Sequence, residues 1–308
     1  MDKAYQVSVS TDIDQLIAAP LFFNHSDYLT KQPIEAPLVF TLLRGEDIVS
    51  QVYFSLSNEV AKSPYRSPFG GIMNYTLLDK ALLYFFWEEI KKGLSKNGIE
   101  QVKMTMPPVA YLNADDHTAI SILKEEAKEC IVEDNYHVYV NEGTFEAQLS
   151  ETQAKKLRRL KRDEFVSQKL HHKNIAYCYD LLVTCFRRKV YPVTMTEEEL
   201  QGAFSQHPLN YELFGCFKEG ELVATAFTVK VTDTIVYLMY NADHPSYHKE
   251  SPLVVLYDYM YNHFRREGVQ LIDLGISSVN GISNSGLETF KKRMGGVRTD
   301  KCSYLFLI

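Results

Sequence analysis

The sequence predicts an α/β fold with a mixed sheet (α+β), in which two copies of one unit follow each other along the chain. Three pairs of matching landmarks predict this duplication, because they recur 174, 170 and 167 residues apart. The landmarks are an apolar hairpin, a helix that ends in glycine, and a closing strand with alternating aromatic residues. Their positions are Phe40 and Phe214, Gly98 and Gly268, and Tyr136–Val140 and Ser303–Leu307. Each copy is therefore expected to be a mixed β-sheet flanked by helices.

The first copy begins with a helix expected from about Thr11, followed by a hairpin over residues 37–57. The hairpin turn contains Gly45 and separates two β-prone apolar runs. Residues 75–98 have the apolar spacing of a helix and end in lysines and Asn97-Gly98, which are helix-stop residues. A strand over 99–106, a helix over 115–127 and the closing strand complete the copy.

The second copy begins after a boundary placed at residues 142–150, which gives domains 1–145 and 146–308. Its expected elements follow the same order: a helix over 153–168, a hairpin over 211–232 and a strand over 234–241. A helix expected to be capped by Ser251 and to run to Arg266 comes next. A strand over 269–276, a helix over 285–294 and the closing strand end the copy.

Composition excludes several classes of function. The chain has 308 residues and a formal net charge of −6, which argues against a general nucleic-acid binder but leaves a local basic patch open, and DNA is not expected as a partner. Its five cysteines have no CxxC spacing, so reduced thiols and a cytoplasmic location are expected. Apolar stretches are far shorter than a membrane span. His171-His172 is a dipeptide and HExxH does not occur, so no metal site is expected.

The C-terminal part resembles a known family. Asp273-Leu274-Gly275, followed by Gly286-Leu287, Phe290-Lys291 and Met294-Gly295, is similar to the D-x-G and G-L-x-x-F-K-x-x-x-G pattern of the FemABX aminoacyltransferases. These proteins carry two GNAT folds in tandem, the fold of acyl-CoA N-acyltransferases. Phe22-Phe23 with Tyr28 resembles the N-terminal entry of the family, and Leu157–Lys161 resembles its interdomain helix. The resemblance implies transfer of an acyl or aminoacyl group onto an amine in the cleft between the copies.

The resemblance also concerns the donor. GNAT enzymes bind the pyrophosphate of acyl-CoA with a glycine-rich turn before a helix. Residues 243–250 stand at that place without a glycine, and the glycines of residues 66–71 have a different spacing. The cofactor therefore stays unknown. Acyl-CoA is a possible donor, but the chain lacks the turn that binds its pyrophosphate, and the resemblance implies aminoacyl-tRNA as an alternative donor. The acceptor is expected to be a small or peptide-like amine.

Amide formation needs a neutral amine, a stabilised oxyanion and a protonated leaving group. Candidates for handling the protons gather where a central strand ends, the edge at which open α/β sheets bind ligands. They are Tyr240, Asp243, His244, Tyr247 and His248. A solvated loop whose polar residues only form turns would show the same residues.

Substrate-binding candidates come from the loops and helix ends of both copies. Arg66 offers an anion anchor and Gly70-Gly71 a close approach to backbone, while Asp273 caps a turn or positions an ammonium. Lys291 follows a polar run, residues 277–285, that is either a lid or an ordinary loop. The complete set is Tyr65, Arg66, Ser67, Phe69, Gly70, Gly71, Arg188, Tyr191, Ser251, Asp273, Asn280, Asn284 and Lys291.

Two hypotheses of different class follow. The chain is an N-acyltransferase or aminoacyltransferase, or it is a catalytically inactive tandem-GNAT protein that binds or scaffolds. The polar groups around the loops favour the first hypothesis, whereas the absence of a pyrophosphate turn favours the second. The basic run Lys155–Arg162 is either a phosphate-binding or a solvated helix face.

Overall fold

The computed structural model describes residues 5–16, 19–112, 116–189 and 192–308. The chain divides into two compact units. Unit 1 comprises residues 1–134, 278–282 and 299–308, and unit 2 comprises residues 135–277 and 283–298. Among the described residues, no helix combines the length and the apolar character that crossing a membrane requires.

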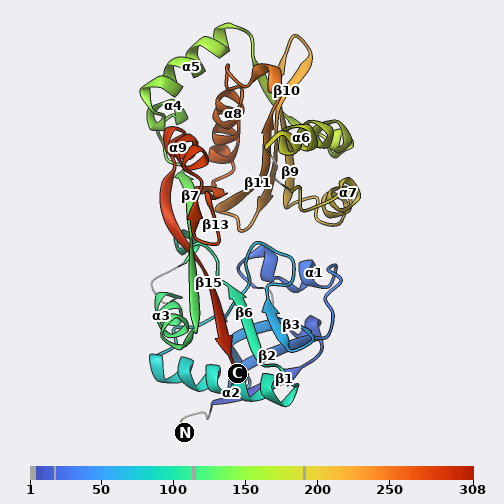
Figure 1. Ribbon diagram of the computed structural model, residues 1–308, viewed down its shortest axis with the longest axis vertical. Helices are drawn as coiled ribbons and strands as arrows, with labels where there is room; N and C mark the ends of the chain where they lie inside the picture. Colours follow the sequence, from blue (N-terminus) through green and yellow to red (C-terminus); the bar gives the residue numbers. More distant parts are fainter. Residues whose placement is uncertain (1–4, 17–18, 113–115, 190–191) are drawn as a thin grey trace. The chain divides into compact units, whose positions relative to one another are not determined.

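The sheet of unit 1 has the strand order β1-β2-β3-β4-β6-β15, and β5 pairs with β3 (Figure 1). The strands β4 and β6 run parallel, whereas the other neighbours in this path are antiparallel. Their bounds are β1 Tyr5–Ser10, β2 Pro37–Arg44, β3 Asp47–Ser57, β4 Val60–Ser63, β5 Met73–Asn74, β6 Gln101–Thr105 and β15 Val297–Leu307.

The helices of unit 1 pack their apolar side chains on this sheet. In α2 (Lys80–Lys96), Asp79 caps the N-terminus by accepting a hydrogen bond from the backbone N–H of Leu82. Phe86, Trp87 and Ile90 of α2 join α3 (Asp116–Glu126) and the strands in one core cluster. Short pieces complete the unit: η1 Ile13–Gln15, η2 Phe22–Asn24, α1 Ser26–Leu29 and η3 Val109–Tyr111.

The sheet of unit 2 repeats this order as β8-β9-β10-β11-β12-β7. The parallel pair is now β11 and β12, and the other neighbours are again antiparallel. The bounds are β7 Glu129–Tyr139, β8 Val166–Leu170, β9 Tyr211–Lys218, β10 Glu221–Lys230, β11 Ile235–Asp243 and β12 Leu271–Ile276. The shared topology confirms the predicted mixed strand order, flanked by helices, in each unit.

Helices cover both faces of the sheet of unit 2. The apolar side of α8 (Leu253–Arg266) forms the main core with β10, β11 and β12, and α6 (Ile175–Lys189) packs on the other face with α7 (Glu197–Gln206) (Figure 1). The remaining pieces of unit 2 are α4 Phe145–Gln148, α5 Glu151–Arg162, η4 His172–Asn174, η5 Pro245–Tyr247 and α9 Ser285–Arg293. The short strands β13 Ser278–Val279 and β14 Ile282–Ser283 pair with each other, and residues 278–282 belong to unit 1.

Each sheet is completed by a strand segment from the other half of the sequence. Ser303–Leu307 of β15 pairs with β6 in unit 1, and residues 135–139 of β7 pair with β12 in unit 2. The sequence places each closing strand in its own copy, so this expectation is wrong. The predicted ranges 1–145 and 146–308 accordingly differ from the two units in these segments.

Two expected helix starts also differ from the structure. The N-terminal segment forms only the single turn η1, with Asp12 as its N-cap, instead of a helix from Thr11. At α8 the N-cap is Pro252, without a side-chain cap, because Ser251 has a φ of +64° and its Oγ accepts a hydrogen bond from Lys156. The opening helix of the second copy is present as α5, capped by Ser150, but it ends at Arg162 and not at residue 168, because Val166–Leu170 forms strand β8 beside β9.

Candidate functional site

A row of polar side chains crosses three neighbouring strands of unit 2. His137 on β7 lies opposite Asp273 on β12, and Asp273 lies opposite Tyr237 on β11. Val138 and Ile272, their sequence neighbours, belong to the core beneath α8. Because side chains alternate along a strand, the row lies on the face of the sheet opposite α8.

This row marks the point where the two parallel strands stop pairing. The β11–β12 ladder covers Ile235–Tyr237 and Leu271–Asp273 and ends there, although β11 continues to Asp243 and β12 to Ile276. Beyond the ladder, the facing edges of both strands carry backbone groups that a ladder would otherwise use. A sheet that opens in this way places side chains next to backbone groups able to bind a ligand.

Asp273 is the centre of the row. Its side chain is buried, and Oδ1 accepts hydrogen bonds from Nδ2 of Asn135 at 2.8 Å and from the backbone N–H of Gly275 at 2.7 Å. Gly275 has a φ of +75°, which favours glycine at the turn that Asp273 caps. The predicted turn cap is therefore present, with the carboxylate held rigidly among the strands.

Lys291 of α9 reaches the same strand end from the helix. Its ammonium group donates to the carbonyl oxygens of Gly275 at 2.8 Å and Ile276 at 2.7 Å, and the residue is only 5% exposed. Burial lowers the pKa of Lys291 to about 7, although the charge of Asp273 opposes this shift. An ammonium has three donors, so one remains for a ligand oxygen.

His137 completes the row and is 2% exposed. Within the part of the chain that the structure describes, neither of its ring nitrogens has a hydrogen-bond partner. Its ring meets that of Tyr139 edge-on, with 4.7 Å between the ring centroids. Burial lowers the pKa of His137, again against the charge of Asp273.

Of the five predicted catalytic residues, Tyr240 lies closest to this row. A register shift in the β10–β11 ladder pairs Phe227 with Tyr240 and Thr228 with Leu238, which turns Tyr240 toward α6 and its Phe186. Burial raises the pKa of Tyr237 above its ordinary value, and the nearby Tyr240 adds to this shift. The Tyr240 hydroxyl shares a hydrogen bond with Thr194.

The other four form a separate group at the end of β11. The Asp243 carboxylate contacts Nδ1 of His248 at 2.6 Å, and the Tyr247 hydroxyl donates to Glu221 at 3.0 Å. His244 uses its Nδ1 to accept from the backbone of Ser246. These contacts order the turn before α8.

In unit 1, packing explains most of the predicted loop. Phe69 is buried between Phe23 and Tyr111. A Cβ on Gly71 would lie 2.3 Å from Sδ of Met106, and one on Gly70 would lie 2.7 Å from Oγ of Ser63. Tyr65 and Ser67 are half-buried, and Arg66 is exposed near Tyr28. Burial raises the pKa of Tyr28, and the charge of Arg66 opposes this shift. The role of the loop in substrate binding stays a prediction.

The remaining candidates are scattered. Asn280 and Gly281 form the turn between β13 and β14, with φ of +52° and +73°, and Asn284 caps α9 through the backbone N–H of Leu287. The predicted lid is thus a short hairpin followed by a capped helix. Arg188 is exposed near the end of α6, whereas Tyr191 lies outside the described residues.

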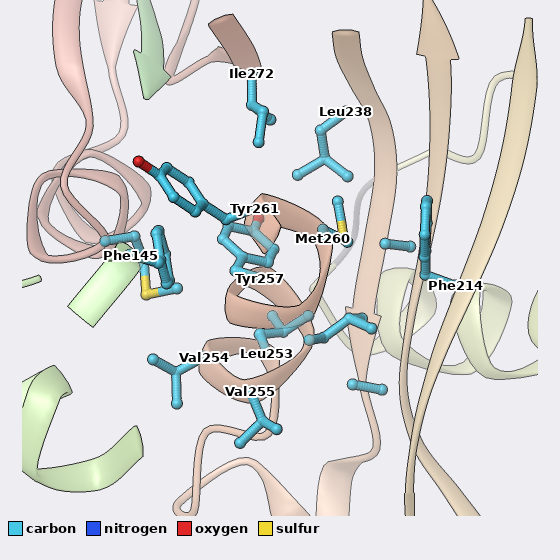
Figure 2. Packing of buried hydrophobic residues seen from close by; sticks show 14 of the residues in the cluster. Phe145, Phe214, Leu238, Leu253, Val254, Val255, Tyr257, Met260, Tyr261 and Ile272 are labelled. Carbon is cyan, nitrogen blue, oxygen red and sulfur yellow. The ribbon is translucent and has the colours of Figure 1, made fainter. Parts of the chain in front are cut away.

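The α8 side of the opened strands is filled with apolar side chains. Figure 2 shows Leu238 and Ile272 from the two strands, with Tyr257, Met260 and Tyr261 of α8 near them. The cavity that these residues and Val138, Phe145 and Leu274 enclose has room for only about 10 Å³. One water fills such a space, so this cavity does not hold a ligand.

A larger hollow of about 630 Å³ lies on the opposite side of unit 2, along α6 and α7. Tyr179, Asp180 and Arg187 of α6 supply its polar lining, and Glu197 begins α7. The Tyr179 hydroxyl donates to the carbonyl of Met195. A mixed lining of this kind suits a polar ligand with both charged and neutral groups.

One group of side chains has the donor set of a metal site. Glu212, His263 and Glu267 bring one ligand atom each within 4.8 Å of one another. Lys169 and Lys230 already contact Glu212 and Glu267 at 2.7 and 2.9 Å. Burial alone would raise the pKa of Glu212, but hydrogen bonds from His263 and Lys169 lower it. Ammonium groups therefore already balance the charge that would attract a cation.

Sequence reasoning found Asp273 and Lys291 but missed Asn135, His137 and Tyr237. All three belong to strands with alternating side chains, and such a pattern predicts that a polar residue faces solvent. The signal that would have found them is the long-range register that sets His137 opposite Asp273.

Residues 150–292 match the family model described as an acetyltransferase (GNAT) domain. Among curated proteins, none matches the chain in sequence. The matched segment contains Tyr237, Asp273 and Lys291, so most of the row lies inside residues 150–292.

Several solved structures are similar in fold to most of the chain. FemX has a TM-score of 0.66 at 12% identity, over 88% of this chain and 87% of that one. A tandem GNAT protein from the clavulanic acid biosynthesis pathway gives 0.57 at 10%, over 92% and 86%. The C-terminal domain of a putative lysylphosphatidylglycerol synthetase from Agrobacterium fabrum gives 0.53 at 10%, over 83% and 81%. The predicted resemblance is confirmed for the fold, and the match of residues 150–292 to the acetyltransferase model supports N-acyl transfer.

Proposed function

We propose that the chain transfers an aminoacyl group from aminoacyl-tRNA onto an amine, with the reacting centre around Asp273 and Lys291. The observation that carries this proposal is the buried ammonium of Lys291 at the end of the β11–β12 ladder. Two backbone carbonyls fix its position, which leaves one donor for an oxygen of the ligand.

Lys291 fits the charge that develops during acyl transfer. The carbonyl oxygen of the donor becomes negative in the tetrahedral intermediate, and a fixed donor in a water-poor site stabilises it strongly. With a pKa of about 7, the same group can also give a proton to a leaving oxygen near neutral pH. Asp273 keeps the strand end in place through Gly275.

Three observations favour an aminoacyl-tRNA donor over acyl-CoA. The turn before α8 has no glycine, and Asp243 and Glu250 bring negative charge to it. The apolar side of the opened strands is filled (Figure 2). The exposed face of α5 carries Lys155, Arg158 and Arg159, which suits a phosphate backbone that replaces their exposed ion-pair partners Glu151, Glu146 and Asp163. The resemblance to FemABX proteins points to the same donor class.

A transfer assay tests this proposal directly. Total tRNA charged with ¹⁴C-labelled amino acids and ¹⁴C-acetyl-CoA are offered separately with short peptides that carry a free amine. We expect transfer from charged tRNA, and Lys291→Met should lower kcat/KM by roughly 10²–10³-fold because the oxyanion donor is lost. The neighbouring Lys292, exposed and paired with Glu288, supplies the control Lys292→Met.

Each contrary result has a distinct meaning. Transfer from acetyl-CoA alone would overturn the proposed donor while keeping the acyl transfer. Binding of charged tRNA without transfer from either donor would instead favour a binding or scaffold protein. Equal losses of kcat/KM in Lys291→Met and Lys292→Met would contradict the catalytic role proposed for Lys291.

A further inference from the structure

We infer that His137 is the base that takes the proton from the amine of the acceptor, so that the reacting centre is the full row His137, Asp273 and Tyr237 together with Lys291. This inference rests on the proposed function and deepens it by naming the residue that activates the nucleophile. It concerns a side chain of β7 that lies outside the matched acetyltransferase segment, residues 150–292.

The first step is the unusual state of the imidazole. Buried polar atoms are almost always hydrogen-bonded, and each one left unpaired costs about 1–3 kcal/mol. Both ring nitrogens of His137 are buried and have no partner among the described residues. A histidine that only packed in the sheet would be replaced by an apolar residue without loss, so its nitrogens point to a ligand that carries donors.

The second step is the placement of the ring. His137 lies directly opposite Asp273, and the edge-on contact with Tyr139 limits how far the ring can turn. Asn135, two residues earlier on the same face, holds the Asp273 carboxylate at 2.8 Å. The imidazole is therefore fixed beside a rigid carboxylate at the end of the β11–β12 ladder.

The third step concerns charge. Asp273 of β12 favours the protonated ring, whereas burial disfavours it more strongly and lowers the pKa of His137 below its ordinary 6.5. On β11, Tyr237 stays neutral because burial raises its pKa, and on α9 the ammonium of Lys291 bonds to the end of β12. His137 is thus a neutral base near pH 7 with a carboxylate beside it to stabilise the imidazolium.

The chemistry balances with one ester donor. The acceptor enters as an ammonium and gives one proton to His137, and its nitrogen then attacks the ester carbonyl of the aminoacyl group. A nitrogen–carbon bond forms and the ester carbon–oxygen bond breaks. Lys291 gives a proton to the leaving ribose oxygen and regains one when the nitrogen loses its second proton. His137 later releases its proton to water, so the net products are an amide, an alcohol and one proton.

Nitrogen NMR on ¹⁵N-histidine-labelled protein tests the base without any donor. The His137 signal is assigned by its loss in His137→Ala, and its titration is followed from pH 5 to 9. We expect a neutral ring at pH 7 and a pKa below 6.5 that falls further in Asp273→Asn, because the stabilising charge is gone. A charged ring at pH 7, or a pKa that Asp273→Asn leaves unchanged, would overturn the assignment.

The transfer assay supplies the second readout. His137→Ala should lower kcat by roughly 10²–10⁴-fold, lose the acidic limb of the pH profile, and regain activity with added imidazole. The exposed His172 gives the control His172→Ala, for which we expect no change and no rescue. A His137→Ala enzyme that keeps its activity, or that imidazole does not restore although it is folded, would refute the role. If the wild type transfers nothing, the proposed function fails, and the NMR result alone decides the state of His137.

Discussion

The strands β15, β6 and β4 of unit 1 hold the same places as β7, β12 and β11 of unit 2, in two sheets of equal order. Toward the core both rows are apolar: Ala61 and Val102 match Val236 and Ile272. On the other face, unit 1 has Leu305, Lys103 and Lys62, with both lysines exposed. Unit 2 has His137, Asp273 and Tyr237 at these places.

The comparison separates what the fold needs from what the chemistry needs. Burying one face of each sheet requires only that every second residue be apolar, and both units satisfy that requirement. The other face can then vary freely. The chemistry of the chain is therefore expected in unit 2, while unit 1 keeps the same scaffold with an ordinary solvated surface.

The sharpest test exchanges charge at matching positions. Asp273→Asn should reduce transfer by roughly 10²–10³-fold, because an amide keeps the shape but removes the charge beside His137 and Lys291. Lys103→Gln, at the matching place in unit 1, should change kcat/KM by about twofold at most. Similar losses in both variants would contradict the division of roles between the units.

Stability should depend on pH through Lys291. Its folded pKa of about 7 lies below the ordinary 10.5, so the unfolded chain binds more protons between these values. The free energy of unfolding should therefore rise with pH over this window, by roughly 3–5 kcal/mol at most. Urea unfolding of the wild type and Lys291→Met at pH 7 and 9.5 measures the difference; parallel curves would refute the buried, deprotonating lysine.

Packing in unit 1 predicts a large effect without a catalytic one. Gly71→Ala should destabilise by about 2 kcal/mol or more, because φ is +89° and the new Cβ meets Met106. Gly98→Ala is the matched control, with φ of +72° but open space around it, and should cost only about 1–2 kcal/mol. Thermal unfolding of both variants measures the two losses of stability. A loss for Gly71→Ala no larger than that for Gly98→Ala would contradict the tight packing of the loop and leave room there for a ligand.

The smallest effects on stability are expected at two helix caps of similar chemistry. Asp79→Ala in α2 and Asn284→Ala in α9 should each lower the free energy of unfolding by about 1 kcal/mol. Only Asn284→Ala should also slow transfer, because α9 carries Lys291. Loss of activity in Asp79→Ala at a temperature where it is fully folded would speak against this difference.

The sequence was sufficient for the duplication, the hairpins and most helices, because Gly98, Gly268 and the turns are local signals. It also pointed to Asp273 and Lys291 through the spacing of their motif. The Thr11 helix is absent, and Asp12 caps the single turn η1 by accepting a hydrogen bond from the backbone N–H of Asp14. Ser251 failed as a cap because Lys156, nearly a hundred residues earlier, holds its hydroxyl.

The partners of the closing strands could not be read in the same way. Tyr136–Val140 and Ser303–Leu307 alternate alike, so either segment suits either sheet on its own evidence. His137 was not predicted for the same reason, because its proposed role depends on its position opposite Asp273 in the assembled sheet. The register of strands far apart in sequence is a property of the assembled sheet.

The exchanged strands have a consequence during synthesis. Unit 1 is encoded almost entirely in the first 134 residues, yet its sheet receives β15 only when residues 303–307 have left the ribosome. Until then the free edge of β6 is open to pairing with other chains. A nascent chain held before this point should therefore need a chaperone, although most of its first unit has already been made.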